Sequence, residues 1–426
     1  MGIFEILLIL FSCMVIGIPI AFSLMLTSLF YLIVKGIPIT IILQRLFAGP
    51  DSFPLLAVPF FIFAAQVMNT TGVTMRIFKF ANSCIGHIKG GLGHVNILAS
   101  IIFAGMSGSA VADAGGLGLV EVTAMRDAGY DDDFALAITA SSSIIGPIIP
   151  PSVPAVIYGA MAGVSIGGLF IGGIIPGLLM GLMLSMLVFL YAYKRNYPTN
   201  KRESIKEILL SGINAFIPML TPLIIIGGIW TGWFTPTESA AVAAIYALIL
   251  GVFVYREINI SDIWKLLKKS AGLSSRGIFI VAAAQIFGYV LAREQVAPKL
   301  SQFLFGITEN PQGILLLIIA FLLVIGTFME PVSAMIILIP VFNPIIRTMG
   351  IHPIQFGIIM IITLMIGLLT PPVGQVLYIL SVVTGAKFEF IAKSVAIFII
   401  PLIIVVLMIV FIPEIVLFLP RIMIGI

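Results

Sequence analysis

Two short stretches interrupt apolar runs of this sequence and hold the backbone groups best suited to binding an ion. They are GPIIPPSVP, from Gly146 to Pro154, and GLLTPPVGQ, from Gly367 to Gln375. Proline donates no backbone hydrogen bond and its ring clashes with the preceding turn, so each proline pair breaks a helix and frees carbonyl oxygens. We expect free carbonyls at Gly146 to Ile149 and at Gly367 to Thr370. Oxygen ligands of this kind suit Na⁺ better than a transition metal, which prefers His or Cys.

A stretch of small residues upstream of each break supplies hydroxyl groups for the same chemistry. The first is GMSGSAVADAGG, from Gly105 to Gly116, and the second is GTFMEPVSAM, from Gly326 to Met335. We predict that each forms the tip of a re-entrant hairpin, because non-helical backbone at membrane depth is tolerated only where protein or a water-filled cavity satisfies it. The hydroxyls that we expect to join the carbonyls are those of Ser107, Ser109, Thr327 and Thr370. Helix N-termini beside the breaks would present N–H groups to an anion.

Charged groups inside apolar segments are further candidates, since they are costly there and usually face a cavity. Asp113 lies on the first hairpin and Glu330 at the second tip. Arg293 is the best candidate to bind a substrate carboxylate, because a guanidinium matches a carboxylate in a bidentate fork. It could instead pair with Glu294 or Glu330, or extend its side chain to the interface. Ser165 is a candidate for the cavity wall, although a serine on a membrane helix also bonds its own backbone.

The composition decides the class of protein that carries these groups. Hydrophobic residues make up 60% of the 426 residues, charged residues only 9%, and the mean hydropathy is +1.22. Soluble domains carry about a quarter charged residues, and apolar stretches of about 20 residues span a membrane, so we expect an all-α polytopic membrane protein. The apolar run at Met1 to Lys35 is too long for a cleaved signal peptide. The two cysteines and three histidines lack the spacing of a zinc, haem or disulfide site.

An internal repeat with a spacing of 221 residues organises the chain. Gly105 pairs with Gly326, and Pro150 and Pro151 pair with Pro371 and Pro372. We therefore predict two repeats, residues 1–206 and 207–426. The first is expected to hold a hairpin at about 96–126 and a broken helix at about 134–161, and the second a hairpin at about 313–347 and a broken helix at about 356–380. With five crossings in each half, an odd number, the second repeat is inverted relative to the first.

Basic residues set the predicted orientation. The loop from Lys194 to Lys206 and the arm from Arg256 to Lys269 are rich in Lys and Arg, whereas the matching arm of the first half holds only Lys35 and Arg45. The positive-inside rule places the rich regions in the cytoplasm and both termini outside. The arm sequence SDIWKLLKKSAGL mixes apolar residues with lysines, so we expect it to lie flat in the interface, ahead of a separate span from Ile278 to Leu291.

Four motifs in order along the chain resemble the large membrane subunit of TRAP transporters, the tripartite ATP-independent periplasmic systems. They are SFPLLAVPFFIFAAQVMN, GPIIPPSVPAVIYG, GGIWTGWFTPTESAAVAA and GLLTPPVGQVLY. The resemblance implies a Na⁺-coupled importer of organic anions in the bacterial inner membrane, in which a transport domain moves like an elevator against a scaffold. It also implies two partners, a small four-helix membrane subunit and a periplasmic substrate-binding protein. No segment of the small subunit is expected here, because the chain begins with the first span of the large one.

In that family the tips and breaks hold the sodium sites and border the substrate site. Carried over by motif, these positions are Ser107, Gly108, Ser109, Gly146 and Pro150, and Gly326, Glu330, Gly367, Thr370 and Pro371. We expect more than one Na⁺ per cycle. The tip SGSAVADAGG, which contains Asp113, is more similar to acid-sugar members such as sialic acid transporters than to C4-dicarboxylate members.

Other classes of protein make different demands on the sequence. A channel would need a ring of polar residues along one continuous pore. An intramembrane protease would need paired aspartates or a HExxH helix, and Asp113 has no matching membrane aspartate, so we expect no enzyme. The short basic loops report orientation and give no sign of nucleic-acid binding. The nearest alternative is a stand-alone Na⁺/dicarboxylate-type symporter with paired hairpins, which would work without a binding protein.

Overall fold

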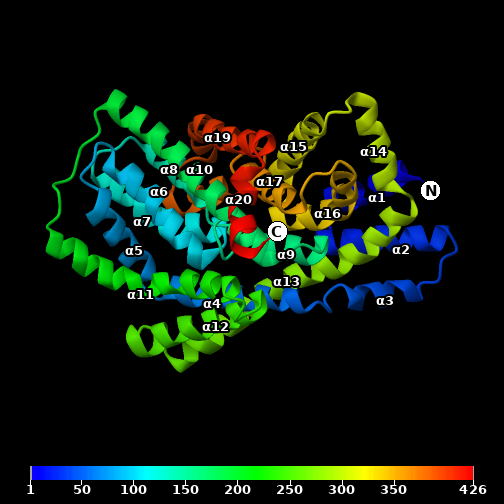
Figure 1. The fold of residues 1–426 in the computed structure, drawn as a ribbon, viewed down its shortest axis with the longest axis horizontal. Helices are drawn as coiled ribbons and strands as arrows, with labels where there is room; N and C mark the ends of the chain where they lie inside the picture. Colours follow the sequence, from blue (N-terminus) through cyan, green and yellow to red (C-terminus); the bar gives the residue numbers. More distant parts are fainter. Residues whose placement is uncertain (1, 426) are drawn as a thin grey trace.

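The computed structural model describes residues 2–425, and within this range the chain forms helices and no strand (Figure 1). Eight helices of the described range are long and apolar enough to cross a membrane. They are Phe53–Thr70, Ile166–Arg195, Ile205–Trp230, Pro236–Val254, Ile260–Arg293, Pro311–Phe328, Pro331–Thr348 and Phe388–Phe411. The all-helical membrane class predicted from composition is therefore confirmed.

Helices from both halves form a frame. The first half contributes α1 (Ile3–Val15), α2 (Ile20–Val34), α3 (Thr40–Ala48), the 3₁₀ turn η1 (Phe53–Leu56) and α4 (Ala57–Thr70), and the second contributes α11 (Ile205–Trp230), α12 (Pro236–Ile249), the π-helical turn η2 (Leu250–Val254) and α13 (Ile260–Arg293). Helix α4 packs on α12, α2 packs on α13, and α4 also contacts α13. In Figure 1, α11, α4, α13 and α3 run along one side of the molecule.

Two helical hairpins pack against this frame. The first consists of α6 (Gly91–Ser107) and α7 (Ala110–Asp127), and the second of α15 (Pro311–Phe328) and α16 (Pro331–Thr348). They occupy the two intervals predicted to form hairpins. A short amphipathic helix that the sequence analysis did not predict precedes each hairpin, α5 (Val73–Ile85) and α14 (Val296–Ile307).

A broken helix follows each hairpin. The first consists of α8 (Asp132–Ser143) and α9 (Val153–Ala162), and the second of α17 (Pro353–Gly367) and α18 (Gln375–Thr384). Both breaks contain a proline pair joined by a cis peptide bond, Pro150–Pro151 and Pro371–Pro372. The long helix α10 (Ile166–Arg195) closes the first half, and α19 (Phe388–Phe411) with α20 (Glu414–Ile424) closes the second.

The two halves interlock where the hairpins meet the broken helices. Helix α9 packs on α16 of the second hairpin, and α18 packs on α7 of the first. Each hairpin therefore contacts the far half of the broken helix that belongs to the other repeat. In both halves the hairpin precedes the broken helix, whereas the repeat relation, the inversion of the second half and the number of crossings stay predictions.

Local sequence rules explain where these helices begin. Pro311, Pro331 and Pro353 stand at the starts of α15, α16 and α17, where a missing N–H costs no helical hydrogen bond. Ser109 and Ser152 cap α7 and α9, because their hydroxyls accept backbone N–H groups at 3.4 and 3.1 Å. Residues that favour the start of a helix thus lie next to the tips and the breaks.

The arm and span predicted for the second half form one helix, so the expected separation between them is wrong. Helix α13 has 34 residues without a break. The Ser274 hydroxyl donates to the Ser270 carbonyl at 2.7 Å and the Ser275 hydroxyl to the Gly272 carbonyl at 3.2 Å, so these two hydroxyls are satisfied inside the helix. At about 1.5 Å per residue the helix is about 50 Å long, more than the hydrocarbon core of roughly 30 Å.

The closing span of the second half begins and ends seven residues earlier than predicted, with the same length of 24 residues. It was expected to run from Val395 to Phe418, but α19 ends at Phe411 and α20 begins after Pro413. Proline cannot continue the hydrogen-bonding pattern of the preceding helix, which explains the end of α19.

Candidate functional site

The first hairpin tip lies against the first break. Ser107 Oγ donates a hydrogen bond to Asp113 Oδ1, and a Cβ added to Gly146 would overlap Asp113 Oδ2. A Cβ added to Gly108, which has a φ of +57°, would lie 2.8 Å from the Pro151 carbonyl oxygen. Only glycine permits so close an approach together with a left-handed backbone. A hydroxyl, a carboxylate and the backbone of the break therefore meet at one place.

Asp113 places a buried carboxyl group at this meeting point. Its side chain is 2% exposed, and within residues 2–425 its Oδ2 atom has no hydrogen-bond partner. A buried carboxylate oxygen without a partner is costly unless an ion or a water meets it. The oxygen atoms of Asp113 and Ser107 are ligands that suit Na⁺, so the residues present fit the predicted ion.

The second tip lies against the second break in the same manner. A Cβ added to Gly367 would overlap the backbone of Gly326, and Val373 N donates to the Thr327 carbonyl at 3.3 Å. The position equivalent to Asp113 is Ala334. This tip has the close backbone approach of the first tip but not its buried carboxylate.

Some oxygen atoms predicted to be free at the breaks already accept hydrogen bonds. The Gly367 carbonyl accepts from Thr370 N at 3.0 Å, and the Pro147 carbonyl accepts from the Ser152 hydroxyl. The hydroxyls of Thr327 and Thr370 donate to carbonyls of their own helices at 2.8 and 3.1 Å. A hydroxyl that donates keeps lone pairs, so both threonines can still bind an ion.

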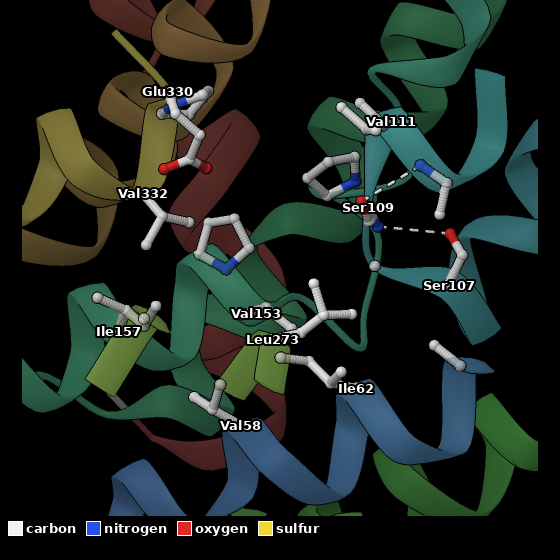
Figure 2. Close-up of a pocket in the computed structure, with 18 of the residues that line it drawn as sticks. Val58, Ile62, Ser107, Ser109, Val111, Val153, Ile157, Leu273, Glu330 and Val332 are labelled. Atoms are coloured by element: carbon white, nitrogen blue, oxygen red, sulfur yellow. Dashed lines mark hydrogen bonds between the residues drawn. The ribbon is translucent and has the colours of Figure 1, made fainter. Parts of the chain in front are cut away.

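A cavity of about 450 Å³ lies between the two tips (Figure 2). Its walls come from both hairpins, both broken helices and the frame helices α4 and α13. Figure 2 shows Glu330 on one side of the cavity, Ser107 and Ser109 on the other, and Val58 and Ile62 of α4 below them. A cleft of this size can hold a ligand of the size of a sugar acid.

Four helix N-termini meet at this cavity. They belong to α7, α9, α16 and α18, whose first turns contribute Ala110, Val153, Pro331 and Gln375 to the lining. A helix N-terminus carries a partial positive charge and unpaired N–H groups, which favours an anion. The backbone alone therefore makes the cavity suitable for a negatively charged ligand.

Two charged side chains add to the lining. Arg276 comes from α13, and Glu330 caps α16, where its Oε2 atom accepts from Ser333 N at 2.8 Å and from the Ser333 hydroxyl at 3.0 Å. Arg276 was not predicted as a site residue, because it lies between the predicted arm and the predicted span. The available signal was an arginine that directly precedes the apolar run beginning at Ile278.

Arg293 lies away from the cavity. It follows Arg276 by 17 residues in α13, which is about 25 Å along the helix axis. Its side chain is exposed and donates to the Tyr289 hydroxyl at 3.1 Å. Glu294, a predicted alternative partner, instead pairs with Lys35 at 2.9 Å. The substrate role of Arg293 stays a prediction that this geometry does not support.

Ser165 also lies outside the cavity lining. Its hydroxyl caps α10 by accepting from Gly168 N at 3.1 Å, which is a structural role. Of the four candidate substrate residues, the structure brings Glu330 to the cavity and Asp113 next to the Ser107 that lines it. Pro150 and Pro371 lie in the breaks behind the tips.

The fold and the site define a class of protein. A helical membrane protein with paired hairpins and discontinuous helices around a cavity lined by helix N-termini has the architecture of a secondary transporter. The chain matches the model of the tripartite ATP-independent periplasmic transporter family, DctM component, over residues 7–415. It belongs to this family.

Several relatives give the same placement, and one solved structure has a similar fold. The chain is 45% identical to the sialic acid TRAP transporter large permease protein SiaM of Vibrio cholerae over 96% of each chain, and 38% identical to the C4-dicarboxylate TRAP transporter large permease protein DctM of Pseudomonas aeruginosa over 88% of each. It is 41% identical to the sialic acid TRAP transporter permease protein SiaT of Haemophilus influenzae, covering 96% of this chain and 67% of the relative. The fold is similar to that of the YdaH transporter of Alcanivorax borkumensis, with a TM-score of 0.62, 13% identity, and coverage of 87% of this chain and 86% of the other.

Proposed function

We propose that this chain is the permease subunit of a Na⁺-coupled importer of an acid sugar, with sialic acid favoured over a C4-dicarboxylate. The cavity between the tips carries this proposal, because four helix N-termini and Arg276 favour one carboxylate there. A dicarboxylate would bring its second negative charge near Glu330, whereas sugar hydroxyls can donate hydrogen bonds to that carboxylate. The similarity to permeases named for sialic acid supports the same substrate class.

Sodium coupling follows from the charge at the first tip. A Na⁺ bound by Ser107, Ser109 and Asp113 against the Gly146 break neutralises the buried carboxylate and holds the tip in place. Without the ion, Asp113 is buried without a partner for its Oδ2 atom, so the tip and the cavity wall that it forms are less stable. A second Na⁺ binds between Thr327 and the break at Thr370, and substrate binds when both tips are ordered.

The remaining parts of the proposal concern the assembly. The chain works in the bacterial inner membrane with a small four-helix membrane subunit and a periplasmic binding protein that delivers the substrate. The basic loops at Lys194–Lys206 and Arg256–Lys269 face the cytoplasm, and both termini face the periplasm. The hairpins and broken helices move together against the frame helices during transport.

Uptake of radiolabelled sialic acid into proteoliposomes tests the substrate and the partners. The vesicles contain the permease with its small subunit, and the binding protein is supplied outside under an inward Na⁺ gradient. We expect uptake only with the binding protein present, and no competition from excess succinate. Equal uptake without the binding protein would show a stand-alone symporter, and strong competition by succinate would overturn the acid-sugar assignment.

A further inference from the structure

A second buried carboxylate lies inside the first hairpin, away from its tip. Glu121 of α7 is 2% exposed and follows Asp113 by eight residues, which is about 12 Å along the helix axis. Its Oε2 atom accepts a hydrogen bond from Asn96 Nδ2 of α6 at 2.7 Å. Its Oε1 atom is buried and has no hydrogen-bond partner within residues 2–425.

Buried polar groups from all three helices of the region surround Glu121. Asn96 Nδ2 also donates to Thr139 Oγ1 of α8 at 2.7 Å, and the Ser142 hydroxyl donates to Asn96 Oδ1 at 2.6 Å. The Ser100 hydroxyl donates to Ser142 Oγ at 3.1 Å. Among the described residues, no ion pair or hydrogen bond joins a basic side chain to this cluster. Within residues 2–425, an ionised Glu121 would therefore have no cationic partner.

The second repeat shows that the fold does not need polar residues at this place. At a spacing of 221 residues, Asn96, Glu121 and Thr139 correspond to Leu317, Phe342 and Met360. Phe342 and Met360 are 3% and 0% exposed, and Phe342 packs edge-on against Phe321, the counterpart of Ser100, at 5.9 Å. Apolar packing serves the second hairpin, so the polar cluster of the first is not explained by packing alone.

We propose that Glu121, Asn96 and Thr139 form an additional buried Na⁺ site in the first hairpin, separate from the sites at the tips. This inference rests on the proposed Na⁺ coupling. An isolated carboxylate is tolerated in a membrane interior when a cation meets it, and carboxylate, amide and hydroxyl oxygens are ligands that Na⁺ accepts. The free Oε1 atom of Glu121 supplies the charge that stabilises the ion.

A rotation of one amide group adapts the cluster to the ion. A half-turn of the Asn96 side chain about its last bond exchanges Oδ1 and Nδ2, so that Oδ1 faces Glu121 and Thr139. Ser142 Oγ can then accept from Nδ2, because its own hydrogen has a second acceptor, the Thr139 carbonyl at 3.2 Å. The side chains of Asn96 and Ser142 therefore keep hydrogen-bond partners with and without the ion, whereas Oε1 of Glu121 gains its partner only when the ion is bound.

Equilibrium binding of ²²Na⁺ to the purified protein tests this site. E121Q removes the charge but keeps the size of the side chain and its contact with Asn96, so the protein is expected to fold. We expect E121Q to bind one Na⁺ fewer than the unchanged protein, while its elution from a sizing column is unaltered. The same number of bound Na⁺ in E121Q and the unchanged protein would overturn the site, since it would mean that Glu121 carries no ion.

Two further variants distinguish Na⁺ bound at Glu121 from Na⁺ bound at the tip and from nonspecific effects of a substitution. D113N removes the charge at the tip, so it is expected to lose a different Na⁺, and D113N with E121Q is expected to lose two. If D113N leaves the number of bound ions unchanged, the tip proposal fails, and the result for E121Q still stands by itself. T363V is the matched control, because Thr363 is the buried counterpart of Ser142 in the second repeat and is expected to change no ion. A loss of Na⁺ in T363V equal to that in E121Q would contradict the assignment.

Discussion

At the scale of single residues, the closeness of the first tip to its break depends on a glycine. We expect Gly146→Ala to raise the Na⁺ concentration for half-maximal uptake by about ten-fold or more, which corresponds to about 1.4 kcal/mol. The physical reason is that the added Cβ would overlap Asp113 Oδ2 and push the carboxylate away from the break. The measurement is substrate uptake at a series of Na⁺ concentrations and constant ionic strength.

Gly116→Ala is the control for this prediction. Gly116 lies on the same hairpin helix α7, and a Cβ there would meet no atom within 4 Å. Its Na⁺ dependence should match that of the unchanged protein. If G146A and G116A behave alike, the contact between Asp113 and the break has no part in ion binding.

Arg276 leads to a second prediction at this scale. We expect Arg276→Ala to weaken direct binding of the substrate to the purified permease by about ten-fold or more, because a bidentate contact to the substrate carboxylate is lost. Titration calorimetry without the binding protein measures this effect. Arg293→Ala is the comparison, and direct binding should be unchanged because Arg293 lies away from the cavity. A large loss in R293A with none in R276A would restore the assignment made from the sequence.

The residues of the tips and breaks show how far the sequence could predict the site. Proline pairs, glycines and hydroxyls at a fixed spacing were sufficient to identify the segments, because each residue type has a direct backbone consequence. The contact between Asp113 and Gly146 joins segments 33 residues apart, and only the packing of the hairpin on the broken helix brings them together. Arg276 was missed because its role depends on the direction in which α13 passes the cavity.

At the scale of elements, each hairpin has one arginine that donates a hydrogen bond to the broken helix of the other repeat. Arg126 at the end of α7 donates to the Thr384 carbonyl at 3.4 Å, and Arg347 at the end of α16 donates to the Ala162 carbonyl at 3.0 Å. The two arginines are equivalent in the repeat, and each acceptor is at the C-terminus of a half-helix, where a cation is favoured. An arginine-to-carbonyl hydrogen bond thus stabilises both interfaces, the one between α9 and α16 and the one between α18 and α7.

Removing the side chain of such an arginine is expected to lower the stability of the protein. We expect Arg347→Ala to lower the free energy of unfolding by about 1 kcal/mol, because a charge-assisted hydrogen bond at a helix C-terminus is lost. Thermal unfolding in detergent measures the change. Arg421→Ala, which removes an exposed ion pair with Glu414, is the control and should change stability by less than about 0.5 kcal/mol. Equal effects of R347A and R421A would mean that the contact to Ala162 does not stabilise the interface.

The helices that were not predicted from the sequence were missed for one physical reason. Helices α5 and α14 are short and only partly apolar, so neither stands out as a span, and their helical state depends on packing beside the hairpins. The junction inside α13 contains glycine and serine, which are weak helix formers, and it stays helical because its hydroxyls bond carbonyls of the same helix. Tertiary context overrides local preference in both cases.

At the scale of the whole molecule, one engineered disulfide bond is expected to block the proposed motion of the hairpins against the frame. A Cβ added to Gly288 of α13 lies 3.8 Å from the Cβ of Pro340 in α16, a distance that suits a disulfide. In a background with Cys13 and Cys84 replaced by serine, G288C with P340C should lose at least about 90% of uptake on oxidation and recover it on reduction. The single variants G288C and P340C serve as controls. Full uptake by the oxidised, cross-linked protein would show that these elements need not separate.

The ion that drives uptake can be identified by exchanging the cation of the gradient. Proteoliposomes with the complete system are given sialic acid and an inward gradient of Na⁺, or the same gradient of K⁺ or choline. The oxygen-lined tips and the buried Asp113 predict uptake with Na⁺ and a loss of at least about ten-fold with either replacement. Uptake that continues undiminished in K⁺ or choline would contradict the proposal that the two tips bind sodium.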